Sequence, residues 1–451
     1  MKRFKWNRHI TVSPARRTAF EILSRVDFEQ SYASNLLASK SLDLLSAEDR
    51  RLCYELVLGL LRHQNKIDYL LTSLSGKKVE RLDKEVVIAL RLGLYQLNYL
   101  SRLPERAVVN ESVNIVKATG KSSASGFVNA VLRKALQIDS KQLIAKVADP
   151  LQRASFEYCH PEWLLKKWSE KIGLQAACQL AEANNNNPQT TFRINSLISE
   201  ASCVVDQLET KGLKLGSDFI EINPNVYKLL SSSSSILTEL MLTGAIYIQD
   251  EASMFVASLL QAEPGDTVLD LCSAPGSKTT MIAEQMQNTG KIIAGDIHYF
   301  RLKVVDESCT RMGIKIVDTV ALDALKPPFH QSVRFDKILV DTPCTGTGTL
   351  RRNPEIKWRL SSQKIAEMAE LQKKILSSIA PYLKPGGRMV YSTCSVETEE
   401  NEEVVADFLS ENQNFSIQPA TKFRTEDGFM RSWPHTDGID GFFAAIFVKI
   451  C

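Results

Sequence analysis

The chain has 451 residues, of which 44% are hydrophobic and 24% are charged, the balance of an ordinary soluble globular protein. A single hydrophobic core seldom serves so long a chain, so we expect two or three domains. No apolar run approaches the roughly 18 residues that a membrane span needs, and the basic start lacks the apolar core of a secretory signal. We therefore expect no association with a membrane.

The cysteine pattern indicates a reducing compartment. The chain has nine cysteines, an odd number, and none of them forms a Cys-x-x-Cys pair. A disulfide framework and a zinc site are both disfavoured by this pattern. The six histidines show no metal-ligand spacing either. We expect a cytoplasmic protein that holds no metal.

The net charge of +3 is unevenly distributed along the chain. Residues 1–140 carry 23 Lys and Arg against 14 Asp and Glu, which leaves 32 against 38 for the remainder. A basic front on a mildly acidic body suggests that the front meets a polyanion. The alternative is that the excess only solvates a helical surface.

The first part of the chain, residues 13–140, predicts a bundle of helices. Ser13 is placed to be an N-cap and Pro14 stands at the first helical position, and apolar residues then recur at helical spacing. Further helices are predicted at residues 85–100, 106–119 and 127–137.

The middle of the chain predicts a mixed α/β region. An amphipathic helix over residues 161–173 carries Trp163 and Trp168, whose rings we expect to pack in a core rather than to stack on bases. A strand is predicted over residues 190–197, where Arg193 could touch RNA or lie on the surface of the strand. The low-complexity runs at 184–188 and 231–235 predict loops.

From about residue 241 onward, short apolar runs alternate with helical stretches. Repetition of this kind predicts a parallel, doubly wound sheet with helices on both faces. The last apolar run, residues 441–449, is expected as an added edge or hairpin strand. Because open α/β sheets bind ligands beyond the carboxyl ends of their strands, these ends are where a site is expected.

Small and acidic residues follow the first strands of this region. The stretch DLCSAPGSKT, residues 270–279, lets the backbone turn tightly at Gly276 in front of a helix N-terminus, yet it matches neither a P-loop nor G-x-G-x-x-G. Asp296 ends the next strand at a distance that suits a ribose diol. Asp323 ends the third and could accept a hydrogen bond from an adenine amine.

Two later strand ends carry thiols, in DTPC at residues 341–344 and in STC at residues 392–394. A lone Asp after a strand is usually a helix cap, and a lone Cys is usually a small buried apolar residue. All these clusters fall in order on one rim of the sheet, which caps alone do not explain. Together they predict a nucleoside-cofactor pocket with two thiols beside it.

The motifs CSAPGSKT, DTPCTGTG and YSTCS resemble those of the RNA 5-methylcytosine methyltransferases. The segments at residues 247–257 and 432–449 are similar to the opening and the close of that family's catalytic domain. The helical front, with RAVVNESVNIVK and FVNAVLRKAL, resembles the RNA-binding antitermination factor NusB. This combination is typical of the bacterial Sun/Fmu branch. The likeness covers nearly the whole chain and is weakest at about 195–240.

The chain departs from the family pattern at three small residues. Ser277 replaces the usual Gly, Thr345 stands where Ser is common, and Ser273 stands where Ala is common. These changes could alter cofactor affinity, but they remove no reacting group.

The resemblance implies a fold of three domains. They are an all-α NusB-like RNA-binding bundle, a small α/β middle domain that links or binds RNA, and a Rossmann-like α/β domain that uses S-adenosylmethionine. Their expected bounds are residues 1–144, 145–240 and 241–451.

The resemblance also implies the chemistry, which is transfer of a methyl group from S-adenosylmethionine to C5 of a specific cytosine of 16S rRNA through a covalent adduct at C6. Cys394 would be the nucleophile, and Cys344 would assist product release. Asp341 would hydrogen-bond the cytosine edge, and Lys278 could touch either ligand. The partner would be small-subunit rRNA, and the chain is expected to be a monomer.

By the same resemblance, one set of residues would line the S-adenosylmethionine pocket: Cys272, Ser273, Ala274, Pro275, Gly276, Ser277, Lys278, Asp296, Asp323 and Asp341. Arg301 would be structural around Asp296, although it could contact RNA.

Two other functions compete with this one. A NusB-like RNA-binding or assembly factor with an inactive body would have damaged motifs, yet Cys394 and Asp341 are both present. An amino-group methyltransferase typically has (N/D)-P-P-(Y/F) at the fourth strand end, where this chain has DTPC.

Overall fold

The computed structural model describes residues 6–230 and 236–450. The chain forms two compact units, residues 1–186 with 350–359 and residues 187–349 with 360–451. The serine run predicted as a loop at 231–235 lies outside the described residues, and the finer division of the chain at residues 144 and 240 stays a prediction. Among the helices of the described part, none is long and apolar enough to cross a membrane.

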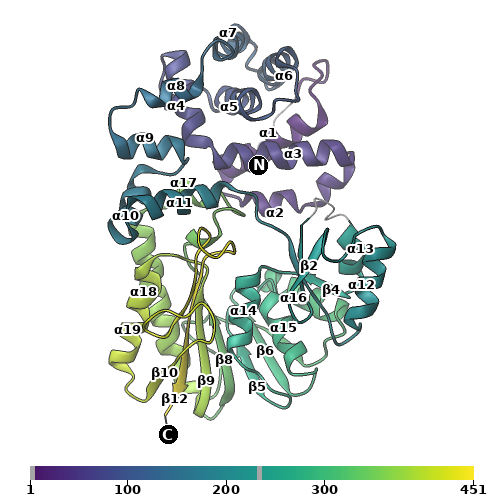
Figure 1. Cartoon of the computed structure of the whole chain (residues 1–451), viewed down its shortest axis with the longest axis vertical. Coiled ribbons are helices and arrows are strands. Elements are labelled where there is room, and N and C mark those ends of the chain that lie inside the picture. Colours follow the sequence, from purple (N-terminus) through teal and green to yellow (C-terminus); the bar gives the residue numbers. More distant parts are fainter. Residues whose placement is uncertain (1–5, 231–235, 451) are drawn as a thin grey trace. The chain divides into compact units, whose positions relative to one another are not determined.

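The first unit is built from helices, as predicted (Figure 1). They are α1 (Pro14–Glu29), α2 (Ala33–Leu37), α3 (Ala47–Arg62), α4 (Gln64–Ser75), α5 (Lys84–Tyr99), α6 (Glu105–Ala118), α7 (Ser125–Ala135), α8 (Ser140–Ala145), α9 (Pro150–Glu157), α10 (Glu162–Ile172), α11 (Leu174–Asn185) and α17 (Ile356–Arg359). Ser13 occupies the N-cap position of α1, but its hydroxyl makes no capping bond to the helix. Its backbone N–H and its hydroxyl both donate to the carboxylate of Glu111 instead.

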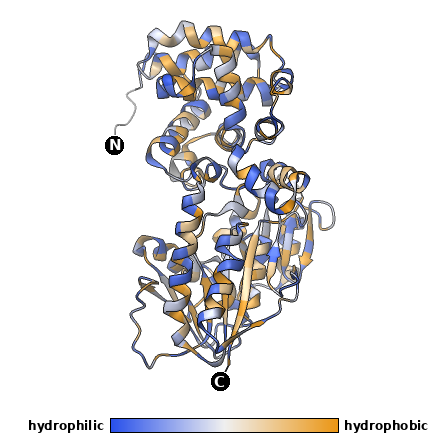
Figure 2. Ribbon diagram, turned by 90° about the vertical axis from the view of Figure 1, so that its left-hand side faces the viewer, coloured by the Kyte–Doolittle hydropathy of each residue, from blue (hydrophilic) through white to orange (hydrophobic). Residues whose placement is uncertain are grey.

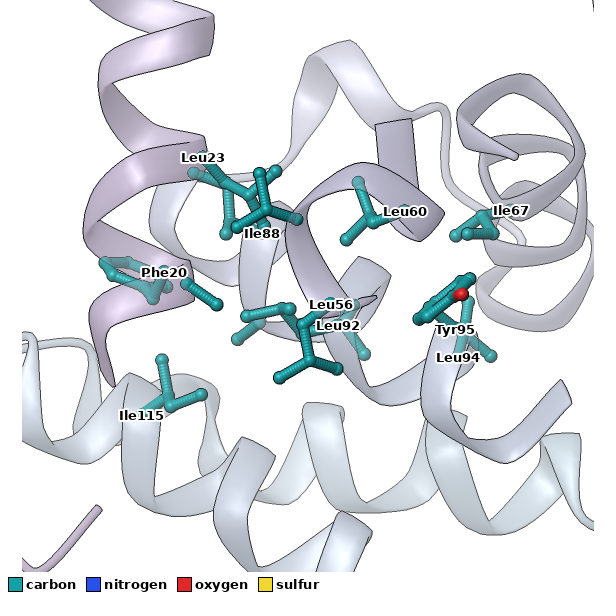
Figure 3. Packing of buried hydrophobic residues seen from close by; sticks show 14 of the residues in the cluster. Phe20, Leu23, Leu56, Leu60, Ile67, Ile88, Leu92, Leu94, Tyr95 and Ile115 are labelled. Carbon is teal, nitrogen blue, oxygen red and sulfur yellow. The ribbon is translucent and has the colours of Figure 1, made fainter. Parts of the chain in front are cut away.

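Helix α5 runs through the centre of this unit, because its apolar residues cover nearly the whole circumference of the helix. Figure 3 shows Leu92 of α5 beside Leu56 of α3, with Phe20 of α1 and Ile115 of α6 in the same cluster. Arg91 is a charged residue among the buried side chains of α5. Its guanidinium donates to Asp68 at 2.7 Å and to Asp27 at 3.0 Å, so the buried charge is compensated.

The segment 350–359 belongs to the first unit although it is surrounded in sequence by the second. The Lys357 side chain is buried and donates to the carbonyl of Arg62 at 3.0 Å and to Asn185 at 3.1 Å. The indole N–H of Trp358 donates to the carbonyl of Leu61 at 2.6 Å. Burial lowers the pKa of Lys357 to about 7. The sequence placed these residues in the predicted domain 241–451, whereas by its contacts the segment belongs to the first compact unit.

The second unit contains two sheets and their helices. Its elements are β1 (Thr191–Ile194), α12 (Ala201–Thr210), β2 (Phe219–Asn223), β3 (Val226–Leu229), α13 (Leu237–Leu242), β4 (Ile246–Ile248), α14 (Glu251–Leu259), β5 (Thr267–Asp270), α15 (Ser277–Gln285), β6 (Lys291–Asp296), α16 (Tyr299–Arg311), β7 (Val317–Ala321), β8 (Phe335–Asp341), α18 (Ser362–Ile379), β9 (Leu383–Thr393), α19 (Glu402–Glu411), β10 (Phe415–Gln418), β11 (Met430–Ser432) and β12 (Phe442–Lys449). Within the described residues, the smaller sheet has the order β2-β3-β1-β4.

Arg193 lies on β1 of the smaller sheet and is buried, with 2% of its surface exposed. Its guanidinium pairs with Glu284 and donates to Gln249 at 3.0 Å and to Thr280 at 2.8 Å. Arg193 therefore lies neither on the strand surface nor where RNA could reach it, and both alternatives from the sequence are wrong. It joins the small sheet to helix α15.

The larger sheet has the order β10-β12-β9-β8-β5-β6-β7, with β11 paired to β12. Strands β5, β6, β7, β8 and β9 are mutually parallel, whereas β12 is antiparallel to β9 and to β10. The last apolar run was expected as an added edge or hairpin strand. β12 pairs antiparallel with the preceding strand β11, as in a hairpin, but it lies inside the sheet between β9 and β10 and not at its edge. Its continuous apolar sequence agrees with this position, because an internal strand is buried on both faces.

Successive residues of the central strands point to opposite faces of the sheet and fill two cores. Val268 packs in a cluster with Val256 of α14 and Ile282 of α15, whereas its neighbour Leu269 packs in a cluster with Leu376 of α18. Helices thus cover both faces, as the doubly wound pattern predicted. Figure 2 shows these helices with hydrophilic and hydrophobic residues intermixed, as amphipathic helices require.

Candidate active site

The strand order creates a switch point between β5 and β8. From β5 the chain proceeds through β6 and β7 on one side, and β8 and β9 lie on the other. Ligands of open α/β sheets bind at such points, beyond the carboxyl ends of the strands. The predicted clusters at residues 270–279 and 341–344 begin at the last residues of β5 and β8, Asp270 and Asp341.

The loop after β5 turns sharply into α15 at Gly276. This residue has a φ of +99°, and an added Cβ would lie 3.2 Å from the Cα of Val305, so glycine is required by conformation and by space. Ser273 ties the loop to β6, since its backbone N–H and its hydroxyl donate to the carbonyl of Gly295 at 2.8 and 3.0 Å. Ser277 begins the helix, and Pro275 is exposed.

Asp296 ends β6, and the sequence predicted that its side chain binds a ribose diol. Its carboxylate accepts from the His298 N–H at 2.9 Å and pairs with Arg301 at 3.1 Å. Arg301 also donates to the Ala274 carbonyl at 2.7 Å, so it braces the first loop against Asp296. Asp323, by contrast, is exposed and accepts from the N–H of Leu325 in its own turn.

Asp270 is a residue of this site that the sequence reasoning missed. It ends β5 with 1% of its surface exposed, and its Oδ2 accepts from the Thr279 hydroxyl at 2.6 Å. Its Oδ1 has no hydrogen-bond partner among the residues that the structure describes. Burial raises the pKa of Asp270 to about 7, and nearby Asp341 adds to the rise. The sequence feature that could have identified it is its position as the first residue of DLCSAPGSKT.

Lys278 and Asp341 form an ion pair across the switch point. The Lys278 Nζ donates to Asp341 Oδ2 at 2.7 Å, and Asp341 Oδ1 accepts from the Ser392 hydroxyl at 2.7 Å. Burial alone would lower the pKa of Lys278, but the Asp341 carboxylate outweighs burial, so the pKa is raised. The lysine is therefore held as a cation among the predicted catalytic residues.

The two thiols meet, although they lie on different loops. The Sγ atoms of Cys344 and Cys394 are 3.3 Å apart, and both residues are half-buried. The hydrogen bond to Cys394, together with burial, raises the pKa of Cys344 well above its ordinary value. Burial also raises the pKa of Cys272, which lies on the loop after β5.

Glu400 connects the two cysteine loops and was not singled out from the sequence. It is fully buried, and its carboxylate accepts from the Thr345 N–H at 2.8 Å and from the Ser395 hydroxyl at 2.5 Å. It also accepts from the Thr345 hydroxyl and from the Gln372 amide. The residue that follows each of the two cysteines is thereby held by the same carboxylate. The acidic run after STC, which contains Glu400, was the available sequence signal.

The closing segment of the chain packs tightly against the first cysteine loop. Gly348 donates its N–H to the Cys394 carbonyl at 2.9 Å, and its own carbonyl accepts from the N–H of Gly441 at 2.9 Å. A Cβ on Gly348 would lie 1.9 Å from the Gly441 oxygen. The next residue, Phe442, lies under Lys278, whose Nζ is 5.3 Å from the ring centre.

The structure thus brings Lys278, Asp341, Cys344 and Cys394 into one cluster, with Asp270 and Asp296 at the neighbouring ends of β5 and β6. Asp323 is the predicted residue whose contacts stay within its own turn. No group of three or more His, Cys, Asp or Glu side chains in the described ranges could hold a metal ion.

Three family descriptions match consecutive parts of the chain. The NusB family matches residues 13–137, the ferredoxin-like domain of RsmF/B-like methyltransferases matches residues 160–220, and 16S rRNA methyltransferase RsmB/F matches residues 257–448. The first match lies in the helical unit, and the last covers nearly all of the larger sheet. The middle match begins in helices α10 and α11 of the helical unit and continues through β1 and α12 to the start of β2.

Proteins and structures similar to this chain cover nearly all of it. The probable ribosomal RNA small subunit methyltransferase B of Bacillus subtilis (strain 168) is 36% identical over 95% of this chain and 97% of that protein. Ribosomal RNA small subunit methyltransferase B of Klebsiella pneumoniae subsp. pneumoniae is 32% identical over 90% and 91%. The crystal structure of PH0851 matches with a TM-score of 0.82 and 28% identity, over 98% of this chain and 100% of that one. The family resemblance of the motifs is confirmed, and the chain belongs to the RsmB/F family of 16S rRNA methyltransferases.

Proposed function

We propose that the protein methylates C5 of a cytosine in 16S rRNA, with S-adenosylmethionine as the methyl donor. The observation that carries this proposal is the pair of thiols, 3.3 Å apart, beside the Lys278–Asp341 ion pair at the switch point. C5 of cytosine is too weakly nucleophilic to take a methyl group unaided. Addition of a thiolate to C6 turns the ring into an enamine, and this divides one difficult step into two easier ones.

The residues at the ends of β5 and β6 fit the proposed cofactor. Asp270 presents a buried carboxylate oxygen without a partner, which the ammonium group of S-adenosylmethionine would satisfy. Asp296 lies where the ribose hydroxyls of a nucleoside bind in such folds. When bound, S-adenosylmethionine supplies an electrophilic methyl group. Residues 272–278 would hold it through backbone groups at the start of α15.

Cys394 is assigned as the nucleophile. The hydrogen bond between the thiols, together with burial, raises the pKa of Cys344, which favours the neutral form of that thiol beside the Cys394 sulfur. Cys394 also contributes to the raised pKa of Lys278, so this cation and the Cys394 sulfur belong to one electrostatic cluster. A thiolate is the form that attacks.

Asp341 would hydrogen-bond the cytosine, and Cys344 would assist release of the methylated product. Asp341 faces the cluster from the end of β8, and a hydrogen bond from the cytosine edge would stabilise the ring as the thiolate adds. Ser392 and Lys278 orient this carboxylate. After methylation the C5 proton is removed and the C6–S bond breaks, which Cys344 would assist from its position beside the Cys394 sulfur.

Covalent trapping on a denaturing gel tests the assignment. The wild type, Cys394→Ala and Cys344→Ala are each incubated with 16S rRNA and S-adenosylmethionine, with the exposed Cys203→Ala as the control. We expect Cys344→Ala to accumulate a protein–RNA adduct, and Cys394→Ala to form neither adduct nor product. Methylation by Cys394→Ala with an inactive Cys344→Ala would reverse the two roles. If every variant methylates and none is trapped, the covalent mechanism is wrong.

A further inference from the structure

A group of apolar side chains is exposed where β6 leads into α16. Four of them lie in a short run and expose large fractions of their surface: Ile297 62%, Tyr299 60%, Phe300 80% and Val304 45%. Single exposed apolar residues are common on protein surfaces, but a contiguous group marks a binding surface more often.

The two aromatic rings of this group, Tyr299 and Phe300, share a neighbouring cation. Their centroids are 5.9 Å apart with the ring planes at 64°. The Nζ of Lys303 lies 5.3 Å from the Tyr299 ring and 5.7 Å from the Phe300 ring. The surface therefore combines exposed π faces with a positive charge, and we refer to Tyr299, Phe300 and Lys303 as the aromatic platform.

The charge around the platform favours an anionic partner. Residues 297–304 contain His298, Arg301 and Lys303 and no acidic side chain, and Asp306 and Glu307 follow in the next turn of α16. Arg301 pairs with Asp296, whereas in the described part of the chain Lys303 forms no ion pair and its ammonium lies beside the two rings. A wholly apolar protein partner would gain nothing from this cation, whereas a nucleic acid offers both bases and phosphates.

The platform is also tied to the proposed site. Its first residue, Tyr299, follows Asp296 after only Ile297 and His298, and Arg301 from the same turn donates to the carbonyl of Ala274 in the loop after β5. A cytosine that enters the site must leave its stack, and its neighbours in the strand then lose a stacking partner. Exposed aromatic rings at the rim can replace the lost stacking.

We propose that the aromatic platform binds the unpaired RNA strand next to the target cytosine. The rings of Tyr299 and Phe300 stack on bases, and Lys303 contacts the backbone phosphate. This inference rests on the proposed function, because it assumes an RNA substrate at the same rim. Each stacked base contributes about 1–3 kcal/mol, which corresponds to a loss of roughly 5- to 150-fold in affinity when one ring is removed.

The test compares Phe300→Trp, Phe300→Leu and the double variant Tyr299→Ser/Phe300→Ser. Leu242→Ser is the control, since Leu242 is an apolar residue of the same unit with 67% of its surface exposed. Affinity is measured by fluorescence anisotropy for an RNA hairpin with cytosine in its loop and for an RNA duplex. Binding of S-adenosylmethionine is measured by calorimetry on the same preparations.

Stacking makes a specific set of predictions. Phe300→Trp keeps hairpin affinity, Phe300→Leu loses at least about fivefold although it stays apolar, and the double variant loses more. Duplex affinity and cofactor affinity stay at the values of the control. Lys303→Gln lowers the slope of log affinity against log salt by about one.

Other results would overturn the inference. Hairpin binding by Phe300→Leu equal to that of the wild type excludes stacking. If the variants lost affinity for S-adenosylmethionine as much as for the hairpin, the rings would be assigned to the cofactor pocket instead. Self-association in sedimentation that the double variant abolishes, with RNA affinity unchanged, would make the platform a protein interface. Failure of the wild type to methylate while it binds the hairpin would refute the proposed function alone.

Discussion

The close approach of Gly348 and Gly441 predicts that Gly348→Ala damages both stability and catalysis. The new Cβ would lie 1.9 Å from the Gly441 oxygen and 2.8 Å from its Cα, against a limit of 3.0 Å that real Cβ contacts respect. The two backbone segments must therefore separate by about 1 Å, since both atoms struck are main chain and no side chain can swing away.

The expected loss of stability follows from the contacts that this separation of the two segments breaks. Overpacking of a tight contact costs about 1–3 kcal/mol, and loss of the Gly441 N–H bond to Gly348 adds about 1 kcal/mol. We expect the free energy of unfolding to fall by about 2–4 kcal/mol. Because Gly348 also holds the Cys394 carbonyl, a shift of about 1 Å at the thiols should slow single-turnover methylation on the order of 100-fold.

The assay combines urea denaturation with single-turnover methylation of 16S rRNA. Gly126→Ala is the matched control: Gly126 lies in α7, a Cβ there meets nothing within 4 Å, and the exchange should stabilise by up to about 1 kcal/mol. Wild-type stability of Gly348→Ala would refute the steric reasoning. A destabilised variant with an unchanged rate would show that this contact does not position the thiols.

Glu400→Ala leaves the Thr345 N–H and the Gln372 amide without an acceptor, so the free energy of unfolding should fall by roughly 3 kcal/mol and methylation should nearly cease. Glu400→Gln should stay within about tenfold of the wild-type rate, because the hydroxyl groups that contact this side chain can rotate to suit an amide. Equal damage from both variants would show that the charge matters rather than the bridge. Asp270→Asn tests the consequence of a pKa that folding raises from 3.8 to about 7. In the wild type, the contribution of neutral Asp270 to the free energy of unfolding is complete below pH 4 and is lost as the pH rises to about 7, by roughly 4 kcal/mol at most. The variant, measured by urea denaturation from pH 5 to 8, should lack this slope, and an unchanged slope would contradict the assignment. Lys357→Met tests the opposite dependence of stability on pH, because the pKa of Lys357 is lowered from 10.5 to about 7. Wild-type stability should fall as the pH drops from about 10 toward 7, and the variant should show no such fall.

The sequence alone predicted most of what depends on local patterns. The helical and strand periods identified the bundle and the doubly wound sheet, because side chains recur every 3.6 residues in a helix and every two in a strand. The cofactor loop with Gly276 and the thiols of Cys344 and Cys394 could be located because each is a short motif at a strand end. The rule that sites lie beyond the carboxyl ends of strands placed them on one rim.

Tertiary structure alone decided the relations between distant segments. The 3.3 Å between the two sulfurs, the bridge from Glu400 to both cysteine loops and the insertion of β12 between β9 and β10 all join residues far apart in the chain. The same is true of residues 350–359, which pack with the first unit. Periodicity reports which face of an element is buried, but not which partner buries it. That choice depends on packing and hydrogen bonding summed over the whole fold, so Glu400 looked from its sequence neighbours like one more surface charge.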